Sequence, residues 1–240
     1  MHERRATFAR ESSMAFPSSP PSRRTVRALA IALVVGIAPG TLAAQMPDLP
    51  VLQNVFPNRG VTAGVNFGST SESRTYAAAA AFATIGSRFA ASLGLGILDP
   101  TADGLSSRST AGLRVAYTGP RFLDRTVAIA AFAGFGGSPH KKEQAGLTNV
   151  PAGLAVGWRH SVGERRGIAV YAAPFYSWSR SSLNGQKESQ GLFRVSAGFD
   201  VALTQRIGVT IGGETGGKAP AGKPGPTGTS FGAGLAYAFR

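Results

Sequence analysis

The last ten residues of the chain alternate strictly between apolar and nearly bare side chains. Phe231, Ala233, Leu235, Tyr237 and Phe239 fall on one face of a strand, and only glycine and alanine fall on the other. Successive side chains of a strand point to opposite faces. A soluble sheet with this pattern would need a charged outer face, which glycine and alanine do not supply. A barrel strand that turns its apolar face to lipid fits the pattern.

This terminal strand resembles that of bacterial outer-membrane β-barrel proteins, whose chains end in alternate apolar residues and a terminal aromatic read by the barrel-assembly machinery. The resemblance implies an all-β fold, an antiparallel up-and-down transmembrane barrel of eight to ten strands, with Phe231 to Phe239 as the assembly signal. Arg240 departs from the family pattern, in which the aromatic is usually last. The partners implied are outer-membrane lipid, lipopolysaccharide and the assembly machinery.

The first 44 residues have the layout of a secretory signal peptide. Three arginines precede an apolar run over residues 28–38, and the small residues Ala43 and Ala44 follow it. The run is shorter than the about twenty residues that a membrane-spanning helix needs. We therefore expect cleavage beside Ala44, with Met14 as an alternative start of the chain.

The rest of the chain divides into a lead and a barrel. Residues 45–59 contain several prolines and are expected to form a periplasmic lead, and residues 60–240 contain about ten segments of the length that a tilted strand needs to cross a membrane. Eight strands are the chief alternative, if residues 60–84 formed a periplasmic or plug hairpin. The alanine run 77–81 favours a helix by propensity, but it is too short to sustain one alone, and a strand is expected there.

The predicted connections alternate in length along the chain. Barrels of this type have short periplasmic turns and longer outer loops, so an even number of strands places both termini in the periplasm. The expected long connections are residues 98–108, 137–148, 179–190 and 215–228, and the tightest turns lie near Gly86 and Thr204.

Aromatic residues gather at the ends of the predicted strands, where tyrosine, tryptophan and phenylalanine favour the two membrane interfaces. Core aromatics of a soluble sandwich have no reason to gather there. The predicted interface aromatics are Phe67, Tyr76, Phe89, Tyr117, Phe135, Trp158, Trp178 and Phe193.

The net charge of +13 is distributed without any block of like charge, and the sequence contains no cysteine. A nucleic-acid-binding protein would gather lysine and arginine on one face, so no nucleic-acid partner is expected. His2, His140 and His160 lie far apart in the sequence, which predicts no metal site. No cofactor is expected either.

Charged residues on the small-residue faces of the strands are predicted to point into the lumen. They are Arg88, Arg114, Arg159, Arg194, Asp200, Arg206 and Glu214. Buried charges must be paired or hydrated, which favours an internal network that plugs a narrow barrel with a structural or surface-interaction role. The alternative is a narrow, porin-like channel that prefers anions because arginines line it.

A third hypothesis is an enzyme. The omptin-type proteases are ten-stranded barrels with aspartate and histidine on outer loops, and this chain is similar in having Asp99, Asp103 and His140 on predicted loops. The spacing of these residues is not diagnostic, and the chain is too short for strands that extend far above the membrane. We therefore expect no catalytic activity, since a positioned base is required.

Overall fold

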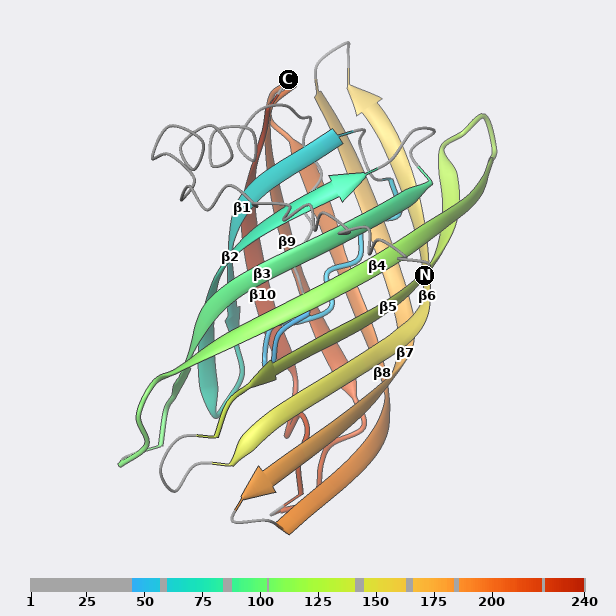
Figure 1. Cartoon of the computed structure of the whole chain (residues 1–240). Coiled ribbons are helices and arrows are strands. Elements are labelled where there is room, and N and C mark those ends of the chain that lie inside the picture. The colour runs from blue at the N-terminus through green and yellow to red at the C-terminus, as the bar shows by residue number, and fades with distance from the viewer. Residues whose placement is uncertain are drawn as a thin grey trace, which may run out of the picture. The chain divides into compact units, whose positions relative to one another are not determined.

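The computed structural model describes residues 45–56, 60–83, 88–102, 104–140, 145–162, 166–183, 186–221 and 223–239. Ten antiparallel strands in these ranges form a closed barrel, in which each strand pairs with its neighbours in sequence and β1 pairs with β10 (Figure 1). The strands are β1 Gly60–Ser69, β2 Ser73–Ala83, β3 Phe89–Pro100, β4 Arg108–Phe122, β5 Val127–Ser138, β6 Gly146–Val162, β7 Arg166–Leu183, β8 Gln186–Ala202, β9 Ile207–Gly216 and β10 Ser230–Ala238. No helix in the described ranges is long and apolar enough to cross a membrane.

The predicted all-β barrel of ten strands is confirmed. The first two strands belong to the barrel wall, with Val65 of β1 opposite Ala78 of β2, so the eight-stranded alternative is wrong. The alanine run 77–81 lies within β2 as expected. The alternating pattern of burial along β10 places Phe231 and Leu235 on the exposed outer face and Ala236 and Ala238 inside.

Several expected features lie outside the described residues. The proposed signal peptide lies wholly outside them, as do Gly86 and Asp103. The first strand begins and the last strand ends at the same end of the barrel, because Thr62 pairs with Ala238. We call this the short-connection end, since β4 and β5 and also β8 and β9 are joined there by four residues each. The opposite end is called the long-connection end, because the three longest connections, of 7, 7 and 13 residues, lie there; the connections of 3 residues after β1 and 2 residues after β7 lie there too.

The connection between β7 and β8 differs from the sequence prediction. Residues 179–190 were expected to form a long loop, but the strand pairing continues to Leu183 opposite Gln186. The pairs in this extension are mostly polar, for example Ser179 with Gln190 and Ser181 with Glu188. Because these residues are polar, the extension lacks the apolar alternation of a membrane strand, although its cross-strand pairs still form. The result is a polar hairpin that lengthens β7 and β8 at the long-connection end.

The expected periplasmic lead lies elsewhere over its described part. Residues 45–56, here called the lumen segment, run through the inside of the barrel, where all of them except Asp48 are buried (Figure 1). The prediction of a lead outside the barrel is thus wrong for these residues. Val51, Val55 and Phe56 instead join a buried apolar cluster with inward side chains of the barrel wall.

Two inward-facing glycines allow the lumen segment to approach the wall. A Cβ atom at Gly112 of β4 or at Gly136 of β5 would overlap the backbone carbonyl of Gln45. A backbone that passes this close to a strand requires a residue without a side chain. The bare inner faces seen in the sequence therefore make room for a second layer of chain inside the barrel.

Candidate functional site

The lumen segment is bonded to the barrel wall by hydrogen bonds along its length. The amide of Val51 donates to Glu214 Oε2 at 2.9 Å, Arg114 Nη2 donates to the carbonyl of Leu52 at 3.0 Å, and Thr118 Oγ1 donates to the carbonyl of Val55 at 3.2 Å. Backbone groups buried in a barrel need such partners. The wall thus supplies partners for backbone groups that the segment's own turns leave unpaired.

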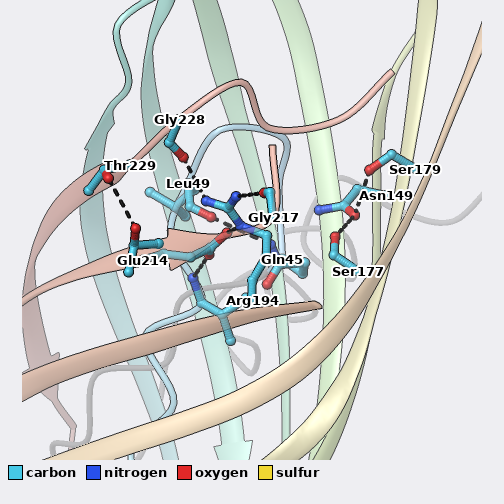
Figure 2. A network of polar contacts seen from close by, with 12 residues as sticks. Gln45, Leu49, Asn149, Ser177, Ser179, Arg194, Glu214, Gly217, Gly228 and Thr229 are labelled. Carbon is cyan, nitrogen blue, oxygen red and sulfur yellow. Dashed lines mark hydrogen bonds and ion pairs between the residues drawn. The ribbon is translucent and has the colours of Figure 1, made fainter. Parts of the chain in front are cut away.

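Arg194 of β8 is the most highly connected of the lumen charges. Its Nε pairs with Glu214 Oε1 at 2.5 Å, and its Nη1 and Nη2 atoms donate to the carbonyls of Gly217 and Gly228 (Figure 2). The side chain of Arg194 is fully buried. One guanidinium therefore joins β8, β9 and the β9–β10 connection, while Glu214 links this group to the lumen segment.

Arg114 of β4 is buried nearer the middle of the lumen, with 2 % of its surface exposed. Asp200 of β8 attracts it electrostatically, and Asp200 itself accepts a hydrogen bond from Thr210 Oγ1. Arg114, Arg194, Asp200 and Glu214 thus lie on the inner face of the barrel, as the sequence predicts. Three of these four are fully buried and engaged with the chain inside the barrel or with one another.

Apolar packing complements these polar contacts. Phe132 of β5 and Phe175 of β7 point inward, with their ring centroids 6.2 Å apart, and they belong to the same buried cluster as Val51 and Val55. The cluster also contains inward alanines of β4 to β7. The lumen therefore has an apolar core in addition to its charged network.

The lumen segment reaches the short-connection end at Phe56. The guanidinium carbons of Arg121 and Arg159 lie 5.9 Å and 5.2 Å from the centroid of the Phe56 ring, within the range of cation–π attraction. Arg159 is half-buried, so the sequence placed it correctly on the inner face but did not identify Phe56 as its partner. Two cations from the barrel wall thus contact the ring at this end of the lumen segment.

Two of the predicted lumen charges lie elsewhere. Arg206 is exposed in the β8–β9 turn, where its Nη1 lies 3.3 Å from the hydroxyl of Tyr237, an outward residue. Arg88 is exposed beside the start of β3. Counted along its strand, each residue falls at a position whose side chain would point inward. Both residues lie beyond the strand ends, however, where the barrel wall no longer encloses them. The prediction that they line the lumen is therefore wrong.

The predicted interface aromatics lie on the outer face of the barrel. Phe67 packs against Tyr76 and Phe89 against Tyr117, with ring centroids 5.4 Å and 5.1 Å apart. Phe135, Trp158 and Phe193 are exposed, and Trp178 is partly exposed. Their contact with the membrane interfaces stays a prediction, as does recognition of Phe231, Ala233, Leu235, Tyr237 and Phe239 by the assembly machinery.

A cavity of about 530 Å³ lies at the long-connection end. The lumen segment forms part of its wall, through Gln45, Asp48 and Leu49, and strands and connections of the barrel form the rest. Figure 2 shows Asn149 near this region, where its Oδ1 accepts hydrogen bonds from Ser177 at 2.7 Å and Ser179 at 3.3 Å. We call this space the outer cavity.

The residues of the protease hypothesis do not come together in the described part of the chain. Asp99 accepts a hydrogen bond from Ser107 Oγ at 2.6 Å, and His140 is exposed beyond the end of β5. No hydrogen bond or ion pair joins Asp99 to His140 within the described ranges. The same ranges contain no group of three or more histidine, cysteine, aspartate or glutamate residues that could hold a metal ion.

Sequence reasoning missed the lumen segment and the inward aromatics Phe132 and Phe175. One signal was present, because Val51, Leu52, Val55 and Phe56 would be costly to expose in a soluble lead. The bare inner faces of the strands also left an unfilled space. Combining these two observations would have predicted that the lead folds into the barrel.

Comparison with known proteins identifies one matching family model. The model of a family described as the outer membrane protein beta-barrel domain matches residues 74–239. Among solved structures, a chain described as "KdgM porin in complex with disordered oligogalacturonate" is 10 % identical, with a TM-score of 0.37 over 75 % of this chain and 99 % of that one. A comparison with curated proteins gives no significant match.

Proposed function

This chain belongs to the outer membrane β-barrel protein family. We propose that it is a plugged barrel, meaning that its lumen is obstructed, with a structural or surface-interaction role in the outer membrane. The observation that carries this proposal is the lumen segment itself. It is buried along nearly its whole length and bonded to β4 and β9. A lumen occupied by the protein's own chain would obstruct the passage of a solute.

The charges of the lumen also favour a plugged barrel over an anion channel. A channel that selects anions needs cations that face the permeating ion. Arg194 is instead paired with Glu214, and Arg114 donates to the lumen segment. Open aqueous channels are found in barrels of about sixteen or more strands, whereas this barrel has ten.

The three longest connections support an orientation for the barrel. We infer that the short-connection end, with the first and last strands, faces the periplasm, because barrels of this kind have short periplasmic turns. The polar hairpin of β7 and β8 and the outer cavity then face the outside of the cell. This arrangement supports a role in surface interaction, with lipid and lipopolysaccharide as neighbours of the exposed apolar face and the assembly machinery as a transient partner.

Single-channel conductance in planar bilayers tests the proposal. Purified native protein is expected to insert without a steady current, and heat-modifiable mobility on gels verifies that the inserted material is folded. Reversal potentials under a salt gradient address the alternative. A steady, anion-selective current from the folded native protein would favour the channel and contradict the plugged barrel.

A further inference from the structure

Two polar residues of the outer cavity wall have side-chain atoms without hydrogen-bond partners. Nε of Arg108 and Oε1 of Gln45 are both buried without a hydrogen-bond partner, and both residues line the cavity. Buried polar atoms in native proteins are nearly always satisfied, and each exception calls for an explanation. The chain thus leaves hydrogen bonds incomplete at two residues of this cavity wall.

The cationic side of the cavity is Arg108 of β4. Its Nη1 donates to the carbonyl of Ala145 at 2.5 Å, which fixes the guanidinium at the cavity wall. No carboxylate within the described ranges forms an ion pair with it. A guanidinium with free N–H groups binds a carboxylate in a paired, charge-assisted geometry. Arg108 is therefore suited to the acidic end of a ligand.

The anionic side is Asp48 of the lumen segment. Its Oδ2 accepts a hydrogen bond from Ser73 Oγ at 2.6 Å, and no cation of the described chain forms an ion pair with it. Asp48 and Arg108 attract each other electrostatically although they are too far apart for an ion pair. The two charges therefore face the same cavity with room between them.

We propose that the outer cavity binds a small zwitterion, such as a free amino acid, with its carboxylate on Arg108 and its ammonium group on Asp48. A simple anion would be attracted by Arg108 but repelled by Asp48 and by Glu72, which also lines the cavity, whereas a simple cation would be repelled by Arg108. Leu98, Leu105 and Leu147 line the same cavity and accommodate an apolar side chain.

The size of the cavity agrees with this class of ligand. Binding sites for small molecules generally enclose about 300 to 1,000 Å³, and the outer cavity encloses about 530 Å³. This inference rests on the proposed plugged barrel, because the lumen segment carries Asp48 and Gln45 and forms one side of the cavity. Conductance reports on closure and ligand binding reports on the cavity, so the two proposals can fail separately.

Equilibrium binding to the full-length mature protein in detergent tests the proposal, with leucine and glycine as zwitterionic probes. Two matched compounds lack one charge each: 4-methylpentanoate is leucine without its amino group, and 3-methylbutylamine is leucine without its carboxylate. Leucine is expected to bind saturably and at least about tenfold more tightly than either compound, as loss of a charge-assisted hydrogen bond implies.

Variants assign the two ends of the ligand. Arg108→Gln is expected to remove the preference for leucine over 3-methylbutylamine, and Asp48→Asn to remove the preference over 4-methylpentanoate. Arg125→Gln is the control, because Arg125 is exposed in the β4–β5 turn at the short-connection end, away from the cavity. Heat-modifiable mobility verifies folding of each variant. Failure of both zwitterions to bind, or equal binding of a singly charged compound to the native protein, would overturn the proposal.

Discussion

Arg194 and Glu214 form a fully buried ion pair inside the barrel, and the second carboxylate oxygen of Glu214 accepts the amide of Val51. The pair therefore links the wall of the barrel to the chain that fills it. An ion pair in this position differs from a surface pair because neither charge can be hydrated if its partner is lost.

Removing one member of this pair should destabilise the folded barrel. Glu214→Leu leaves Arg194 as a buried charge without a counter-ion, and the expected loss in the free energy of unfolding is about 3 to 5 kcal/mol. Urea unfolding in lipid vesicles measures this loss. The control is Glu188→Gln, which breaks the half-exposed pair with Lys223 and should cost about 0 to 1 kcal/mol. Equal losses in the two variants would show that the buried pair has no special role.

A charged side chain on the outer face should destabilise the barrel where that face contacts the centre of the bilayer. Leu154 lies midway along β6, 56 % exposed on the outer face and opposite Ala131 of β5. Leu154→Arg is expected to reduce the free energy of unfolding by about 2 to 4 kcal/mol. Leu123 in the β4–β5 turn is also exposed, and Leu123→Arg should change stability by less than about 0.5 kcal/mol. Similar tolerance at both positions would contradict the membrane contact of β6.

The lumen segment lies so close to two inner glycines that adding one methyl group at these positions should displace it. Alanine at both Gly112 and Gly136 overlaps the carbonyl of Gln45, so the double variant is expected to displace the start of the lumen segment. Because the native sequence has no cysteine, a single Val51→Cys reporter measures this displacement through its rate of reaction with a water-soluble thiol reagent. The rate should be low in the native background and should rise in the double variant.

The control for this experiment is Gly119→Ala. A Cβ atom at Gly119 would lie 3.5 Å from the carbonyl oxygen of Ile129, an ordinary contact. Labelling of the reporter should therefore stay slow in this variant. Fast labelling of Val51→Cys in the native background would mean that the lumen segment is not held inside the barrel.

The mature protein is expected to begin at Gln45 or beside it, as the small residues after the apolar run predict. N-terminal sequencing of protein extracted from outer membranes provides the measurement. Retention of residues 1–40 in that material would contradict the prediction.

The sequence predicted the barrel wall well because the wall obeys a local rule. Alternation in β10 and in β3 depends only on neighbouring residues, and the membrane imposes it on every strand. The same rule correctly placed Arg114, Arg194 and Glu214 inside the barrel. It failed for Arg88 and Arg206, since parity assigns a face to a side chain but not the point where the wall ends.

The lumen segment could not be predicted by the same rule. Its contacts join residues far apart in the chain, such as Leu52 with Arg114 and Val51 with Glu214, and its own sequence has neither alternation nor helical periodicity. The polar hairpin of β7 and β8 was missed for a related reason. Strand pairing there comes from cross-strand hydrogen bonds among polar residues, for which apolar alternation gives no signal.

Conductance of the native protein beside a variant that lacks residues 45–56 tests most directly whether the lumen segment closes the barrel. Both proteins are inserted into planar bilayers after heat-modifiable mobility has verified that each is folded. The native barrel is expected to carry no steady current, whereas the shortened barrel, with the same ten strands and an emptied lumen, is expected to conduct. Equal, steady currents from the two proteins would contradict the account, because the lumen segment would then not obstruct the barrel.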